Sequence, residues 1–95
     1  MTGDRGTLNG RISIRPDDSG FKQHRHARTN GYQWTITLNG EPVLGCITAD
    51  SEHGMVVRYK HDTAGALIWD KERQCLVDEV LHGKVEITYC PEVTL

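Results

Sequence analysis

A hairpin signal at residues 32–47, YQWTITLNGEPVLGCI, constrains the fold of this chain more than any other feature. Apolar and polar side chains alternate from Tyr32 to Asn39, which is the period-2 pattern of a strand with one buried face. Asn39 and Gly40 are the pair that a two-residue type I′ turn favours, because both residues must adopt positive φ. The segment therefore predicts a β-hairpin.

The turn also sets which residues oppose one another across the hairpin, because each pair follows from the one before it. The predicted pairs are Leu38 with Glu41, Thr37 with Pro42, Ile36 with Val43, Trp34 with Gly45, and Tyr32 with Ile47. Pro42 has no N–H to donate, so the outer side of its strand near the turn is predicted to be an edge of the sheet. From this register and the same alternation elsewhere, we expect the core to contain Trp34, Ile36, Val43, Ile47, Val57, Tyr59, Val85 and Ile87.

Strand signals recur along the rest of the chain and are separated by turn compositions rich in Gly, Asp and Pro. The further strands are expected at residues 11–15, 55–60, 66–70 and 84–89, and the turns at 16–20, 49–54, 61–65 and 70–74. Residues 55–60 and 66–70 are predicted to form a second hairpin. Residues 74–82 fit either a strand or one or two helical turns, and the strand is favoured because Gly83 follows. The predicted fold is therefore all-β and mainly antiparallel, a small sandwich or barrel of about six to seven short strands.

The length of 95 residues suits one globular domain with one modest core. We expect a single β domain over residues 1–95, with residues 1–20 forming a partly ordered N-terminal arm. No apolar run approaches the roughly 18 residues that span a bilayer, and the first residues lack the apolar centre of a secretory signal. Three widely spaced cysteines form no CxxC pair, which favours a reducing, cytoplasmic setting. They are Cys46, Cys75 and Cys90.

The segment HRHAR, residues 24–28, is the strongest candidate for a functional site. If residues 21–28 are extended, alternate side chains point to one side, here Lys22, His24, His26 and Arg28. Two histidines at i and i+2 on a strand can begin a metal site, as in the HxH pattern of the cupins. The glutamate that cupins carry after this pattern is absent here, and the flanking Lys and Arg side chains would repel a dication. No metal or other cofactor is therefore expected.

Charge is distributed unevenly along the chain. Residues 1–31 contain six Lys or Arg against three Asp, a net +3, whereas residues 32–95 contain five against ten Asp or Glu, a net −5. The basic segment is therefore predicted to contact an acidic surface of the same chain, a sister subunit or another protein. Direct binding of nucleic acid is disfavoured, because the rest of the chain is acidic. The expected partner-binding residues are Lys22, His24, Arg25, His26 and Arg28.

No catalytic motif is recognisable in the chain. Residues 50–53, DSEH, bring a hydroxyl, two carboxylates and an imidazole together in the sequence. Adjacent residues of a turn seldom converge in space as catalysis requires, so these four are interpreted as a polar turn. The protein is predicted not to be an enzyme.

Two stretches, GEPVLGCITADSEHGMVVRYKHDTAGALIWD and LHGKVEI, resemble small uncharacterised β-rich proteins encoded in tailed-phage and prophage genomes. The shared pattern is a short strand, an Ala-Asp turn, a VxxY strand, a D-x-x-G loop and a terminal G-K-V-E-I strand. The resemblance covers about half of the chain and implies a phage origin but no known activity. For a phage-encoded protein of this kind we expect a non-enzymatic protein-interaction module, located in the virion or in the host-cell cytoplasm. Its expected role is that of an accessory virion or head-assembly protein. The alternatives are an inhibitor that binds a host protein, such as a defence or nucleic-acid-processing complex, and a small HxH metal-binding protein.

Overall fold

The computed structural model describes residues 6–91, which form ten strands and one helix. Every strand pair in this part of the chain is antiparallel. The elements are β1 (Gly6–Leu8), β2 (Arg11–Ser13), α1 (Phe21–Thr29), β3 (Tyr32–Leu38), β4 (Glu41–Pro42), β5 (Cys46–Asp50), β6 (Met55–Tyr59), β7 (Trp69–Asp70), β8 (Cys75–Leu76), β9 (Asp78–His82) and β10 (Val85–Pro91). Residues 1–5, which belong to the predicted N-terminal arm, lie outside the described residues, as do residues 92–95.

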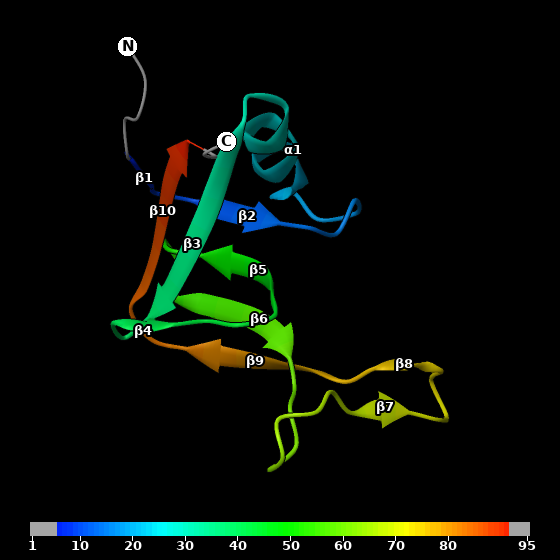
Figure 1. Ribbon diagram of the computed structural model, residues 1–95. Helices are drawn as coiled ribbons and strands as arrows, with labels where there is room; N and C mark the ends of the chain where they lie inside the picture. Colours follow the sequence, from blue (N-terminus) through cyan, green and yellow to red (C-terminus); the bar gives the residue numbers. More distant parts are fainter. Residues whose placement is uncertain (1–5, 92–95) are drawn as a thin grey trace.

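The strands form two open four-stranded sheets and a small hairpin arm (Figure 1). The first sheet has the order β1-β10-β3-β4, and the second has the order β2-β5-β6-β9. β7 and β8 form a separate hairpin that projects beyond the second sheet, and the strands of the first sheet cross those of the second steeply (Figure 1). The prediction of a mainly antiparallel β chain is confirmed, although the strands outnumber the six or seven expected.

The hydrophobic core lies between the two sheets and takes residues from both. Its buried members are Ile12, Ile36, Ala49, Val56, Val85 and Ile87. The predicted core residues that are confirmed as buried are Ile36, Ile47, Val85 and Ile87. Trp34 and Val43 are partly buried and pack against the core. The prediction for Val57 and Tyr59 is wrong, since neither is buried.

The error in β6 concerns which of two adjacent valines faces the core. Val56 is fully buried, between Ala49 of β5 and Leu81 of β9. Val57 lies on the opposite face, where its partner in β9 is the exposed Val80. The sequence pattern of this strand does not indicate which of its two faces is buried, because apolar residues lie on both faces. The neighbouring strands make the choice.

The turn at Asn39 and Gly40 forms as predicted, with φ of 53° and 83°. The predicted pairs next to the turn are confirmed, namely Leu38 with Glu41 and Thr37 with Pro42. Beyond them, the Val43 N–H donates to the Ile36 carbonyl at 3.0 Å. The first part of the hairpin therefore has the register that the sequence predicts.

Past Val43 the predicted register is wrong. The chain turns away at Gly45, where φ is 67°, and enters the second sheet as β5. Trp34 and Tyr32 therefore lack the predicted partners Gly45 and Ile47, and on the other edge of β3 they lie opposite Tyr89 and Pro91 of β10. β10 pairs with all seven residues of β3, along the edge opposite the one that pairs with β4.

The second predicted hairpin is wrong beyond its turn. The turn itself forms, with the Gly65 N–H donating to the Asp62 carbonyl at 3.0 Å. β6 then pairs with β9 rather than with residues 66–70, and β7 pairs with β8. The favoured strand interpretation of residues 74–82 is confirmed by β8 and β9.

Residues 21–28 are helical rather than extended, so the assumption under which their alternate side chains would point to one side does not hold. α1 contains no Gly, Pro, Val or Ile, and its Lys, Gln, Arg and Ala residues are good helix formers. Gly20 precedes the helix and lets the chain approach β2, because a Cβ at this position would lie 2.9 Å from backbone atoms of Ile12 and Ser13. The buried Ala27 completes the packing of α1 against the sheets.

Candidate functional site

The two edges of β3 are covered unequally. One edge pairs with β10 along all seven residues. On the other edge, β4 pairs with Thr37 and Leu38, and the Val43 N–H donates to the Ile36 carbonyl. Within residues 6–91, no strand covers this second edge alongside residues 32–35.

The backbone groups of β3 alternate between these two edges. The Asn39 N–H donates to the Lys84 carbonyl at 2.8 Å on the β10 side, whereas the Ile36 carbonyl accepts a hydrogen bond on the β4 side. Even-numbered residues of β3 therefore direct their N–H and C=O groups toward the β4 side. For Trp34, both backbone groups point to the edge on which none of the described strands lies alongside residues 32–35.

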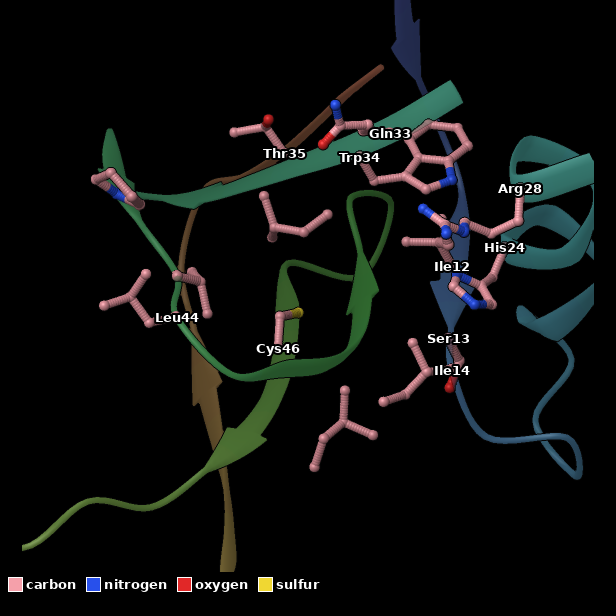
Figure 2. A pocket seen from close by; sticks show the side chains of 14 residues that line it. Ile12, Ser13, Ile14, His24, Arg28, Gln33, Trp34, Thr35, Leu44 and Cys46 are labelled. Atoms are coloured by element: carbon pink, nitrogen blue, oxygen red, sulfur yellow. The ribbon is translucent and has the colours of Figure 1, made fainter. Parts of the chain in front are cut away.

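A groove of about 410 Å³ runs along this uncovered edge (Figure 2). β3 supplies residues 33–36 of the lining, and the segment that leads from β4 into β5 faces them. Residues 12–14, in and after β2, form a further part of the wall. His24 and Arg28 of α1 lie at one end (Figure 2).

Most of the groove is apolar, but its helical end is basic. Ile14 and Leu44 both line it, and they are large apolar side chains with 45% and 73% exposure. His24 and Arg28 provide polar groups at the α1 end, and Leu44 lies away from that end (Figure 2). None of the described residues that line the groove is Asp or Glu. The site therefore combines exposed apolar surface with positive charge.

The Trp34 indole lies at the basic end and carries an unpaired donor. Its ring packs edge-to-face on Tyr89, with 5.2 Å between centroids. The Nε1–H is buried and has no hydrogen-bond acceptor among the described residues. In Figure 2 this nitrogen is on the side of Arg28 and His24. A buried donor without an acceptor costs about 1–3 kcal/mol, which an arriving acceptor would relieve.

The structure brings together two of the five residues predicted to bind a partner. Residues four apart share one face of a helix, so His24 and Arg28 both line the groove. His26 lines a second hollow of about 320 Å³ on the other side of Trp34, while Lys22 and Arg25 are exposed and line neither. The predicted single face with all four alternate residues is wrong, because successive helical residues are about 100° apart.

The same helical geometry separates the two histidines. His24 and His26 were considered as ligands of one metal ion on the assumption of an extended strand. On α1 they line different hollows. In the described part of the chain, no three His, Cys, Asp or Glu side chains are grouped as metal ligands would be.

Residues 50–53 form the turn between β5 and β6, and their polar groups serve that turn. The Asp50 carboxylate, 4% exposed, accepts hydrogen bonds from the backbone N–H groups of Glu52 and His53. It also lies 2.8 Å from His53 Nδ1. The Ser51 hydroxyl interacts instead with backbone groups of the β1–β2 turn. These contacts support the polar-turn interpretation.

Arg11 links this turn to the segment before α1. Its guanidinium donates to both carboxylate oxygens of Asp18, at 2.8 and 2.7 Å, and to Asp50 at 3.4 Å. The paired guanidinium lowers the pKa of Asp18 to about 2. Burial alone would raise the pKa of Asp50, but hydrogen bonds from His53 and Arg11 outweigh it and lower this pKa. The network holds the approach to α1, and so one end of the groove, against the second sheet.

Sequence reasoning missed Trp34, Ile14 and Leu44 as site residues. Trp34 was expected only in the core, and its position at the uncovered edge follows from the departure of the chain at Gly45. The predicted sheet edge at Pro42 is confirmed, because β4 is the outermost strand of its sheet. That proline was the signal in the sequence that pointed to this side of the molecule.

Comparisons of the chain with protein-family models, with curated proteins and with solved structures each found no match. Over the described residues, no helix is both long and apolar enough to cross a membrane. The groove and the uncovered edge of β3 are therefore the basis for a functional proposal.

Proposed function

We propose that the protein is a non-enzymatic protein-interaction module that binds an extended segment of another polypeptide along the uncovered edge of β3. The observation that carries this proposal is that the backbone N–H and C=O of Trp34 face an apolar groove in which no described strand lies. An uncovered sheet edge can form backbone hydrogen bonds with an added strand, and neighbouring pockets then provide side-chain specificity.

The dimensions of the edge suit a short segment. Residues 32–35 span about 14 Å at roughly 3.4 Å per residue, which is enough to pair with about four residues of an added strand. The exposed side chains of Ile14 and Leu44 offer apolar contacts beside it. Many native edges are protected by charged residues, whereas this one carries the uncharged Gln33 and Thr35.

The wider role that we propose is that of a phage-encoded accessory protein in virion or head assembly, built on a small sandwich-like scaffold. Two further features suit a protein that makes several contacts. β9 is an edge strand of the second sheet, and Trp69 of the projecting arm is 56% exposed. An inhibitor of a host protein would use the same edge of β3, and the experiments that follow distinguish the two roles.

Selection from a displayed library of random decapeptides tests the binding proposal. Leu44→Asp places a carboxylate in the groove at an exposed position, which should leave folding intact. Leu67→Asp is the matched control, because Leu67 is an exposed leucine (46%) that does not line the groove. Selected peptides should bind wild type and L67D alike, and L44D at least about 10-fold more weakly, which is about 1.4 kcal/mol.

Hydrogen exchange locates the bound segment, and size-exclusion chromatography addresses the wider role. A strand added at this edge should slow exchange of the Tyr32 and Trp34 amides. Peptides that bind L44D as tightly as wild type, or that leave both amides unprotected, would refute strand addition. A stable multimer of the protein would support the assembly role, and a monomer would favour the inhibitor.

A further inference from the structure

We infer that the bound segment carries an apolar and an acidic residue two positions apart, and that the acidic side chain binds at the α1 end of the groove. This inference rests on the proposed strand addition at β3. Residues two apart in a strand point to the same face, roughly 6.8 Å from each other. On that side the groove offers the apolar side chain of Ile14 near the basic pair His24 and Arg28, and that of Leu44 farther from α1 (Figure 2).

The charge of the groove favours a carboxylate. Its described lining contains no Asp or Glu, and α1 has no acidic residue. The helix carries further positive or titratable side chains on its exposed surface, namely Lys22, Arg25 and His26. The whole chain has a net charge of −2, so this end of the groove differs in sign from the rest of the protein. An acidic side chain is attracted to it, and a Lys or Arg side chain is repelled.

Arg28 and Trp34 supply the hydrogen-bond donors. Arg28 also makes an interaction within the chain, but a guanidinium has five N–H donors and can serve a second acceptor. The buried Trp34 Nε1–H has no acceptor among the described residues. A carboxylate at this end of the groove accepts from both groups, and hydrogen bonds to a charged acceptor are stronger than those to a neutral one. Binding therefore gives the Trp34 Nε1–H an acceptor, which the described residues do not provide.

Short peptides of defined sequence test this specificity. The probes are fluorescein-labelled heptapeptides with Val and Glu two positions apart in a Ser/Thr background. Both orders of Val and Glu are needed, because parallel and antiparallel strands present them in opposite order. At low salt, one Glu peptide should bind about 10-fold more tightly than its Gln counterpart, and the Lys counterpart most weakly. The difference should shrink as ionic strength rises.

Two substitutions in the same helix locate the carboxylate. Arg28→Gln removes a positive charge from the groove. Arg25→Gln is the matched control, because Arg25 is exposed and does not line the groove. R28Q should reduce the preference for Glu over Gln below about 2-fold, whereas R25Q should retain most of it.

An NMR measurement reports directly on the Trp34 donor. Trp34 and Trp69 are the two tryptophans of the chain, so the Trp69→Phe variant has a single indole N–H resonance. This resonance should move downfield when the Glu peptide binds, and move less with the Gln peptide, because the charged acceptor forms the stronger hydrogen bond. If this resonance does not move when the protein is saturated with the Glu peptide, Trp34 is not part of the binding site.

The outcomes separate this inference from the proposal on which it rests. Equal affinity for Glu and Gln peptides, or an unchanged preference in R28Q, would overturn the acidic specificity. If the peptides selected from the library contain no acidic residue, the acidic specificity is overturned as well. Strand addition is retained in that case if the same peptides bind L44D more weakly than wild type. If neither the library peptides nor the probes bind, strand addition itself fails, and the inference fails with it.

Discussion

Replacing Val56 with Ala should destabilise the protein by about 2 kcal/mol, whereas the same change at Val57 should cost less than about 1 kcal/mol. The two residues are adjacent in β6 and identical in type, so they form a matched pair. Val56 is 0% exposed and lies between β5 and β9 on the core face of the second sheet. Val57 is only partly buried on the opposite face.

The magnitude follows from the burial of Val56. The substitution removes two carbon groups, worth about 1.6 kcal/mol at roughly 0.8 kcal/mol each. A void of about 40 Å³ that does not close would add about 1 kcal/mol, at roughly 24 cal/mol per Å³. The expected loss is therefore about 1.6 to 2.6 kcal/mol, depending on how far the neighbouring strands relax. At Val57 much of the transfer free energy is absent, because the side chain already contacts water.

Urea unfolding followed by near-ultraviolet circular dichroism measures the loss of unfolding free energy in each variant. Thermal unfolding measures the corresponding fall in melting temperature. A domain of this size loses about 4–8 °C of melting temperature per kcal/mol, so V56A should melt about 8–16 °C below wild type and V57A only a few degrees below it. A loss at Val57 that equals or exceeds the loss at Val56 would refute this orientation of β6.

Two further predictions concern ionisable groups. The pKa of Asp18 is lowered from 3.8 to about 2 by its pairing with Arg11, so this carboxylate stabilises the fold above about pH 4 and the contribution disappears as the pH falls toward 2. Asp18→Asn should therefore be less stable than wild type by roughly 1–2 kcal/mol at about pH 7 and nearly as stable as wild type at about pH 2, as measured by urea unfolding. A stability difference between the two proteins that does not change with pH would contradict this. Burial raises the pKa of Cys46 to about 11, so at about pH 8 iodoacetamide should alkylate the exposed Cys75 well before Cys46 in the native protein. Mass spectrometry of the alkylated sites checks this order, and comparable rates would show that Cys46 is accessible.

Little of the candidate groove could be predicted from the sequence. His24 and Arg28 were among the expected partner-binding residues, but the helix that places them on one face was not expected. The alternating histidines suggested a strand, whereas helix propensity together with packing of Gly20 and Ala27 against neighbouring elements produces α1. No pattern in the sequence indicates that the Nε1–H of Trp34 lacks an acceptor among residues 6–91, because this depends on which groups surround the indole in space.

The sequence by itself determined the features that depend on a few neighbouring residues. These are the positive-φ turn at Asn39 and Gly40, the alternation that buries Val85 and Ile87, and the polar turn at residues 50–53. Each arises from backbone preference or from hydrogen bonds within a few positions.

Only the tertiary structure decided which strands pair over long distances and which faces they bury. β3 pairs with β10, and β6 turns Val56 inward, because strands distant in the sequence complete the ladders and the core. The uncovered edge of β3 follows from the same choice. The chain leaves the first sheet at Gly45, and β5 then pairs with β2 and β6. β5 is therefore not available to cover the edge of β3 at Trp34.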